Sequence, residues 1–343
     1  MPRTFTLNTR LSIPAVGLGC WMGDPISGTD DPIQQVSYDM VRSGIDVGYT
    51  HFDTASGYGN EEAVGRAIRD SGKDRSSLFV TTKLLNSDHH RVAEAFEDSL
   101  KALGLEYIDL YLMHWPMAGD IHTGASLPID ASPTFSETWA EMEKLLETHK
   151  GKVRNIGVSN FSVKNLEILL KTAKVVPAVN QVEAHPYCPQ TDLVPYCASK
   201  GIHLTAYSPV GQGASSPLFS DPLILSLAKK YNRSAGALLL SWGVQRGFSV
   251  VPKSANPVRQ RDNLDVFKLE EGDVKALEEL HHEPGKHRSL CDYGIAPDPS
   301  YGPDGPETLF GWKLKEDLGW DYGITVQADG GWGGRLKGKG KKE

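Results

Sequence analysis

Four polar residues stand at or near the ends of apolar, strand-like runs in the first third of the chain. Asp53 and His114 lie near the ends of the second and fourth runs, Lys83 lies at the end of the third, and Tyr58 follows the second in a Tyr-Gly-Asn-Glu loop. Where parallel strands end at one edge of a barrel, such side chains converge. The sequence therefore predicts a shared site for a carboxylate, an imidazole, an amine and a phenol.

This set of groups suits the reduction of a carbonyl group. A carbonyl oxygen needs a proton as hydride reaches its carbon, and the donor works best with a pKa near the working pH. A free tyrosine titrates near pH 10. We expect the ammonium of Lys83 to lower the pKa of Tyr58, and Asp53 to keep Lys83 charged and in place. His114 would hold the carbonyl oxygen or share the proton.

Later strand-like runs end in polar residues suited to a flat, amide-bearing ring. Ser159, Asn160 and Gln181 can hydrogen-bond the carboxamide of a nicotinamide, while Tyr207, which Ser208 follows, can stack on the ring. After the last run, Lys253, Ser254 and Arg259 surround the start of a short predicted helix, an arrangement typical of an anion site. A phosphate bound there predicts NADP rather than NAD.

The elements that must position these residues are eight short apolar runs alternating with segments of helical spacing. The runs cover residues 15–21, 49–55, 78–84, 107–115, 153–160, 178–185, 202–210 and 248–254. Gly44, Gly72, Gly104, Gly151 and Gly201 stand where helices are expected to stop. Eight such units predict a (β/α)8 TIM barrel, an α/β fold. The alternative, an open doubly wound sheet, would be expected to carry a Gly-x-Gly-x-x-Gly turn, which the first run does not supply.

Both ends of the chain depart from the repeating pattern. Residues 5–14 predict an N-terminal β-hairpin with Asn8 and Thr9 in its turn, placed to cover the lower mouth of the barrel. We expect residues 1–283 to form the barrel with this hairpin. Residues 284–343, rich in Gly, Pro and Trp, would form a long irregular C-terminal tail of the same single domain: a strap up to about Tyr322, then a flexible basic end.

Composition excludes several classes of function. With 36 Lys and Arg against 43 Asp and Glu, the net charge of −7 offers no general attraction to nucleic acid or anionic membranes. No apolar run approaches the roughly 20 residues of a membrane helix. The four cysteines are scattered, which favours reduced thiols. We therefore expect a cytoplasmic protein, a monomer or else a dimer, with no nucleic-acid or membrane partner.

The ordered motifs of this chain resemble the aldo-keto reductase superfamily, particularly its fungal aldehyde, glycerol and sugar reductases. The matching segments, between about residues 5 and 283, are VGLGCW, HFDTASGYGNEEAVGRAI, VTTKL, YIDLYLMHWP, IGVSNF, NQVEAHPY, AYSPVG and VPKS, with Arg259 and Asn263. Two positions depart from the family pattern. Asp262 stands where relatives usually have Glu, and Leu85 replaces a frequent Trp, which is expected to reshape the substrate pocket.

The resemblance implies a catalytic tetrad of Asp53, Tyr58, Lys83 and His114, and NADPH bound across the barrel mouth. The implied cofactor contacts are Ser159, Asn160, Gln181 and Tyr207 at the nicotinamide, Lys253, Ser254, Asn256 and Arg259 at the adenosine phosphate, and Asn263 at the adenine; Ser208 lies beside them. Trp21, Trp115, the 117–133 loop and the tail aromatics would build a pocket for an aldehyde or ketone. Aryl or medium-chain aldehydes and sugars all suit such walls.

The sequence leaves two other classes of function as alternatives. A barrel that retains its cofactor as a redox-sensing subunit would not need the complete tetrad. A metal-dependent hydrolase or lyase would need clustered His and carboxylate ligands, such as a His-x-His pair, which the sequence lacks. The adjacent pairs His89–His90 and His281–His282 predict surface positions instead. We therefore expect no metal site.

Overall fold

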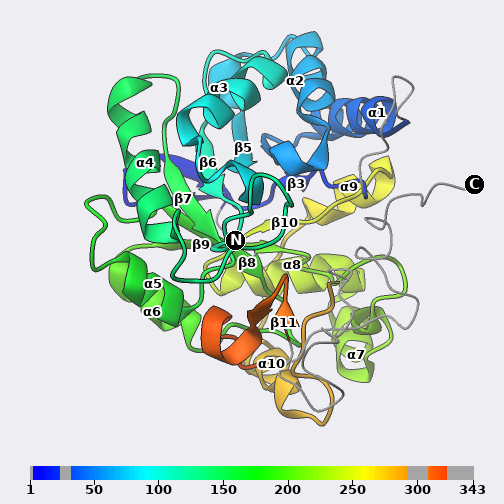
Figure 1. The fold of residues 1–343 in the computed structure, drawn as a ribbon. Helices are drawn as coiled ribbons and strands as arrows, with labels where there is room; N and C mark the ends of the chain where they lie inside the picture. Colours follow the sequence, from blue (N-terminus) through cyan, green and yellow to red (C-terminus); the bar gives the residue numbers. More distant parts are fainter. Residues whose placement is uncertain (1–2, 24–31, 292–307, 323–343) are drawn as a thin grey trace, which may run out of the picture.

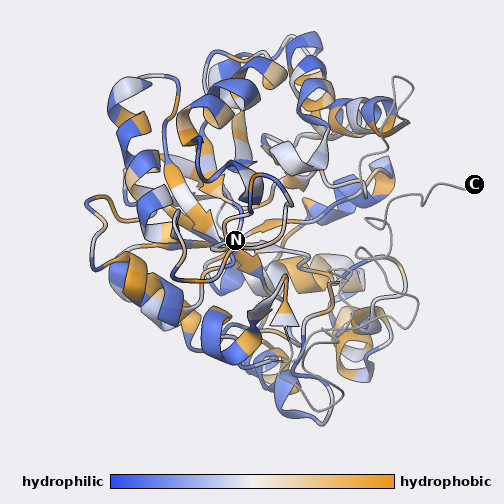
Figure 2. Ribbon diagram, in the orientation of Figure 1, coloured by the Kyte–Doolittle hydropathy of each residue, from blue (hydrophilic) through white to orange (hydrophobic). Residues whose placement is uncertain are grey.

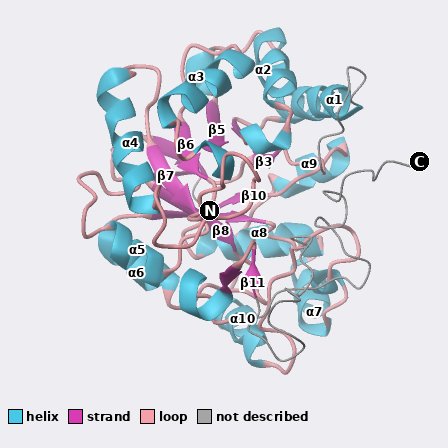
Figure 3. Cartoon of the chain, in the orientation of Figure 1, coloured by secondary structure: helices cyan, strands magenta, loops and turns pink. Residues whose placement is uncertain are grey.

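The computed structural model describes residues 3–23, 32–291 and 308–322, and its centre is a sheet of eight parallel strands (Figures 1 and 3). The strands run in sequence order around the sheet and are β3 (Leu18–Gly19), β4 (His51–Asp53), β5 (Phe79–Leu84), β6 (Leu110–Met113), β7 (Ile156–Ser159), β8 (Val179–Glu183), β9 (His203–Tyr207) and β10 (Ser249–Val251). Each falls inside one predicted run. The (β/α)8 prediction is confirmed.

Backbone hydrogen bonds between the first and last strand regions close the barrel. The amide of Gly17 donates to the Val250 carbonyl at 2.8 Å, and that of Gly19 donates to Pro252 at 3.0 Å. Strands of this kind are covered on both faces, so they read as continuous apolar runs. All six residues of β5, Lys83 among them, are buried. Figure 2 shows the apolar colour concentrated on the central strands and the hydrophilic colour on the outer faces of the helices.

Helices surround the barrel and connect its strands (Figure 1). They are α1 (Pro32–Val47), α2 (Glu61–Asp70), α3 (Val92–Leu103), α4 (Phe135–Thr148), α5 (Val163–Leu169), α6 (Leu193–Lys200), α7 (Pro222–Tyr231), α8 (Ala235–Gln245), α9 (Pro257–Asn263) and α10 (Glu271–Glu278). Several begin at residues whose side chains cap the amino end of the helix. Thr134 and Glu137, for example, form a reciprocal capping box on α4.

The prediction that helices end at glycines is only partly correct. Gly104 and Gly201 end α3 and α6 in the left-handed conformation. Gly44, however, lies inside α1, which continues to Val47. A Cβ atom at Gly44 would stand 2.7 Å from Cδ2 of Leu18 on β3. This glycine therefore permits close helix–strand packing instead of ending the helix.

The predicted hairpin is present as β1 (Thr4–Thr6) and β2 (Ser12–Pro14), with Asn8 and Thr9 in the turn. Its apolar side chains Leu7 and Ile13 are buried in one cluster with Phe79 and Leu110, at the amino ends of β5 and β6. The hairpin therefore covers the end of the barrel opposite the strand carboxyl ends, as expected.

Residues 308–322 form a strap along one side of the barrel, coloured orange-red in Figure 1. The strap contains β11 (Thr308–Leu309), β12 (Trp312–Lys313) and a π-helical turn over Leu314–Leu318. Trp312 donates through Nε1 to the Leu127 carbonyl at 2.7 Å, and Asn165 donates to the Asp317 carbonyl at 3.0 Å. The strap is thus joined to the β6–α4 loop and to α5. The predicted flexible basic end after Tyr322 lies outside the described residues.

Candidate active site

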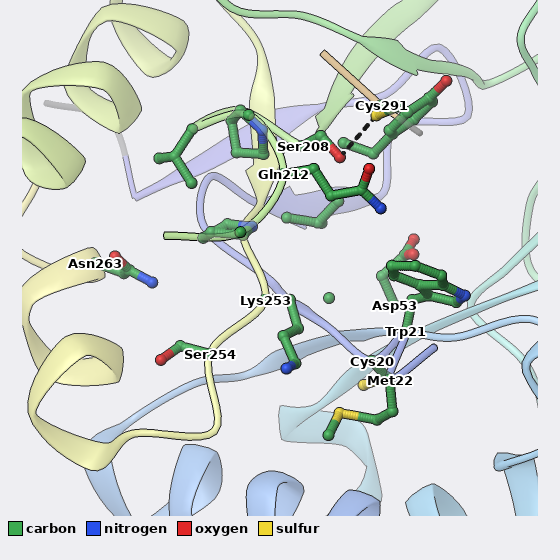
Figure 4. A pocket seen from close by; sticks show the side chains of 18 of the residues that line it. Cys20, Trp21, Met22, Asp53, Ser208, Gln212, Lys253, Ser254, Asn263 and Cys291 are labelled. Carbon is green, nitrogen blue, oxygen red and sulfur yellow. Dashed lines mark hydrogen bonds between the residues drawn. The ribbon is translucent and has the colours of Figure 1, made fainter. Parts of the chain in front are cut away.

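A cavity of about 880 Å³ opens at the carboxyl ends of the barrel strands. Most of the predicted site residues line it: Trp21, Asp53, Tyr58, His114, Trp115, Ser159, Asn160, Gln181, Tyr207, Ser208, Lys253, Ser254, Arg259 and Asn263. Two predicted residues, Lys83 and Asn256, are not among its lining residues. Figure 4 shows Asp53 and Trp21 on one side of the cavity and Ser254 and Asn263 on the other, with Lys253 between them.

A buried ion pair lies beneath the cavity. Lys83 is wholly buried, and its Nζ donates to Oδ1 of Asp53 at 2.6 Å and to the Thr54 carbonyl at 2.8 Å. The same Nζ stands 5.1 Å from the centre of the Tyr58 ring. Although burial opposes the charge on Lys83, Asp53 and Tyr58 together raise the pKa of Lys83 above its usual value. Lys83 is therefore held as an ammonium ion beside the phenol.

The pKa of Tyr58 differs in direction from the sequence-based expectation. Burial raises the pKa of Tyr58 above its usual value, and the charge of Lys83 opposes this effect without overcoming it. The expected net lowering is therefore wrong for this arrangement, because desolvation of the phenolate outweighs the attraction of Lys83. The phenol keeps its proton at neutral pH, which is the form that a proton donor needs.

His114 packs edge-on against Tyr58, with ring centres 5.7 Å apart. Burial, together with the positive charge of Lys83, holds the pKa of His114 well below its usual value. The imidazole is therefore neutral at neutral pH. Both rings face the cavity, so an oxygen atom bound there can accept hydrogen bonds from a neutral phenol and a neutral imidazole.

The predicted nicotinamide contacts form a hydrogen-bonded group of their own. Gln181 donates through Nε2 to Oδ2 of Asp53 at 2.6 Å, and the Tyr207 hydroxyl donates to Oδ1 of Asn160 at 2.8 Å. Asn160 donates to the His114 carbonyl at 2.9 Å, and Ser159 donates to the Gln181 carbonyl at 2.8 Å. These bonds link the wall of the cavity to the Asp53–Lys83 pair. The sequence predicted the pair but not this link.

The opposite end of the cavity is basic. Within the described ranges, neither Lys253 nor Arg259 forms an ion pair with a carboxylate, and partial burial together with the charge of Arg259 lowers the pKa of Lys253. Asn256 is not among the residues that line the cavity, and its Oδ1 accepts hydrogen bonds from the amides of Val258 and Arg259 and so caps α9. Its contact with the adenosine phosphate stays a prediction.

Aromatic residues from two distant segments form one wall of the cavity. Trp115 contacts Phe310 of the strap edge-on at 5.4 Å between ring centres, and Trp320 at 6.0 Å. Phe310 itself lines the cavity. Leu85, which was expected to shape the pocket, is absent from its described lining; Leu85 lies against Gly57.

Sequence reasoning missed several lining residues, including Cys20, Met22, Gln212, Phe219, Ser234 and Cys291. For the loop around Gln212, the glycines of GQGASS after the seventh run were an available signal. Phe310 is one of the tail aromatics that were expected at the pocket, whereas Cys291 carried no signal, because only the folded tail brings it to the barrel mouth.

No cluster of three or more His, Cys, Asp or Glu side chains in the described part of the chain is placed to hold a metal ion. His89 nevertheless differs from the prediction, because it is buried at 2% exposure with Nδ1 beside the Thr138 hydroxyl at 3.2 Å. The surface position predicted for His89 is therefore wrong.

None of the helices in the described ranges is long and apolar enough to cross a membrane.

The model of the Aldo/keto reductase family matches residues 15–282 of this chain. The chain belongs to the aldo/keto reductase family. It is 42% identical over 302 residues to glycerol 2-dehydrogenase (NADP(+)) of Saccharomyces cerevisiae, and the matched region covers 83% of this chain and 93% of the relative. It is also 40% identical over 301 residues to aldehyde reductase YPR1 of the same yeast, with the same coverage.

Solved structures give the same family. An aldo-keto reductase from Bombyx mori, crystallised in complex with NADP, has a TM-score of 0.74 and 36% identity over 84% of this chain and 94% of that one. An aldo/keto reductase from Brucella melitensis has a TM-score of 0.70 and 39% sequence identity, and the match covers 81% of this chain and 98% of that one. The resemblance and the barrel predicted from the sequence are both confirmed.

Proposed function

We propose that this aldo/keto reductase reduces an aldehyde or ketone to an alcohol with NADPH, and that Tyr58 is the proton donor. The observation that carries the proposal is the position of Tyr58: its ring faces the cavity and lies 5.1 Å from the ammonium of the buried Lys83–Asp53 pair. The names of the two yeast relatives, a glycerol dehydrogenase that uses NADP(+) and an aldehyde reductase, support the same chemistry.

The donor set of the cavity fits NADPH. Its basic end offers the cations of Lys253 and Arg259 to a phosphate, and guanidinium and ammonium groups favour such anions. The far end offers the polar side chains of Ser159, Asn160 and Gln181, with the Tyr207 ring beside them, to a nicotinamide. Ser208, Ser254 and Asn263 also line the cavity and remain proposed contacts. Asn256, whose Oδ1 caps α9, remains a proposed contact of the phosphate. Bound NADPH supplies the hydride.

The protein's own groups then manage the proton and the charge. Tyr58 donates its hydroxyl proton to the carbonyl oxygen as negative charge develops there. Lys83 stabilises the resulting phenolate, because its ammonium is buried in a medium where charge is weakly screened. Asp53 keeps Lys83 charged, and neutral His114 orients the carbonyl oxygen by a hydrogen bond. Trp21 and Trp115 wall off the substrate from water.

We further propose that the protein acts in the cytoplasm as a monomer. All four cysteines are buried free thiols, which is typical of a reducing compartment. Size-exclusion chromatography with light scattering tests the oligomeric state; a stable dimer at micromolar concentration would contradict the proposal.

The direct test is NADPH oxidation by the purified chain with glyceraldehyde, xylose, benzaldehyde and a simple ketone. We expect turnover with at least one of them, unaffected by EDTA. NADPH binding without turnover of any carbonyl would favour the cofactor-retaining subunit instead. A matched assay with NADH tests the preference for the phosphorylated cofactor.

A further inference from the structure

A buried carboxylate at the end of β8 holds the beginning of the C-terminal tail. Glu183 is 1% exposed, and the Leu290 amide donates to its Oε1 at 2.6 Å while the Ser289 hydroxyl donates to its Oε2. His185 donates through Nε2 to Oε1 at 2.8 Å. These hydrogen bonds hold the pKa of Glu183 below its usual value although burial opposes this. A buried carboxylate with such partners is costly to disturb.

Neighbouring residues hold the same piece of tail. The Arg288 amide donates to the Tyr187 carbonyl at 3.2 Å. Asp221, the cap of α7, accepts from the Tyr187 hydroxyl at 2.7 Å and from Nζ of Lys286 at 2.6 Å. The tail is therefore fixed at successive points from Lys286 to Leu290. Glu183 makes the contacts nearest to the cavity.

The next residues of the tail reach the cavity wall. Cys291 lines the cavity and lies 3.1 Å from Oγ of Ser208, the contact drawn in Figure 4 beside Gln212. The side chain of Leu290 lies against Gly211, where a Cβ atom would stand 3.2 Å from Cδ1 of Leu290. Gly211 lines the cavity too. A shift of the tail at Leu290 thus moves one wall of the cavity.

We propose that Glu183 is a positioning residue for substrate binding, which anchors the Ser289–Cys291 segment and so fixes the wall formed by Cys291 and the 208–212 loop. The inference rests on the proposed function for its kinetic consequence. It gives the Glu-x-His-x-Tyr part of the NQVEAHPY motif a role: Gln181 contacts Asp53, whereas Glu183 and Tyr187 hold the tail.

The test uses the full-length protein with Glu183→Gln and, as a milder change, Ser289→Ala. Glutamine keeps the shape of the side chain but loses the charge and one acceptor oxygen. We expect Cys291 to react with N-ethylmaleimide about tenfold faster, because losing one hydrogen bond to a charged group is worth that factor or more. The KM for benzaldehyde should rise about fivefold or more, with kcat changed less than about threefold.

Two controls separate anchoring from general loosening. Glu143→Gln removes a carboxylate that also accepts two backbone amides, from Lys174 and Val175, but on α4 and outside the lining of the cavity. It should change neither Cys291 labelling nor KM. Cys197, buried on α6, reports unfolding, and peptide mass spectrometry assigns each labelled thiol.

Any of four results would overturn the inference. The labelling rate of Cys291 could be unchanged in Glu183→Gln, or Cys197 could be labelled faster by the same factor. Glu143→Gln could show the same effects, or the kinetic loss in Glu183→Gln could be confined to kcat. Because labelling needs no turnover, the inference can hold or fail by itself. An inactive wild-type protein with the expected labelling would count against the proposed function alone.

Discussion

At the scale of single residues, burial and charge act on Tyr58 in opposite directions. Burial raises its pKa, and the adjacent ammonium of Lys83 lowers it by less. The phenol therefore stays protonated in the resting protein, and Lys83 stabilises the phenolate once the proton has been transferred. This role of Lys83 depends on Asp53, since an isolated ammonium at zero exposure would lose its proton or destabilise the fold.

Lys83→Met tests this dependence. The substitution leaves Asp53 buried without its cation, so we expect a loss of about 3–5 kcal/mol in the free energy of unfolding and at least about a hundredfold loss in kcat/KM. The double variant Lys83→Met with Asp53→Asn should recover much of the stability but none of the activity. Urea denaturation and steady-state kinetics measure the two effects. Recovery of activity in the double variant would show that the pair serves the fold only.

Lys253 and Arg259 carry the predicted choice of cofactor. The double variant Lys253→Met with Arg259→Ala should weaken NADPH binding about a hundredfold, since each removes a charge-assisted contact, and should change NADH binding only slightly. Fluorescence titration measures both affinities. Arg261→Ala, on the same helix but outside the lining of the cavity, is the matched control. Equal losses for the two cofactors would argue against a phosphate site.

At the scale of helices and strands, close packing explains features that spacing alone could not predict. α2 and α3 approach so closely at Gly65 that a Cβ atom there would stand 1.8 Å from the Leu103 carbonyl oxygen. Gly44 acts similarly between α1 and β3. Glycine at such positions provides space for a neighbouring backbone or side chain, whereas the sequence pattern suggested a helix stop at Gly44 and made no prediction for Gly65.

Gly65→Ala is therefore expected to cost at least about 3 kcal/mol of unfolding free energy, because the backbone carbonyl of Leu103 has to move. Gly272→Ala is the control, since that glycine is also helical but has open space around its Cα. It should be neutral or stabilising by up to about 1 kcal/mol. Chemical denaturation of the two variants measures the difference. Similar costs at both positions would contradict the packing argument.

The eight strands could be predicted because buried parallel strands are continuous apolar runs, and their polar last residues located part of the cavity lining. The cap that the Asn256 side chain forms on α9 could not be predicted, because it depends on local backbone geometry. The hydrogen bond from Gln181 to Asp53 joins residues 128 positions apart. Such contacts depend on barrel closure and not on any local spacing.

At the scale of the whole molecule, distant segments complete both ends of the barrel. The N-terminal hairpin covers one end, and the strap brings Phe310 and Trp320 to Trp115 at the other. The sequence predicted the strap and placed its aromatic residues at the pocket, but it did not predict which residues they contact. The interior also contains buried histidines: burial lowers the pKa of His51 to about 4 and that of His89 to about 3.

These two histidines make the free energy of unfolding depend on pH. Their pKa values in the folded protein lie below the usual 6.5, so as the pH falls the unfolded chain binds protons before the folded protein does. The stability that is present above pH 6.5 is therefore lost as the pH falls towards 4. The shift at His51 corresponds to roughly 3 kcal/mol. Urea titrations between pH 7 and 4.5 should show this loss, and His51→Gln should reduce it more than His90→Gln, which changes an exposed histidine. Equal slopes in both variants would contradict the assignment.

The most direct test of the account is single-turnover NADPH oxidation by Tyr58→Phe with a small aldehyde. The phenylalanine keeps the ring against His114 and Lys83 but has no proton to donate. We predict a rate lower by at least about a hundredfold with NADPH affinity nearly unchanged. A rate within a few-fold of the wild-type rate would show that Tyr58 does not protonate the carbonyl oxygen.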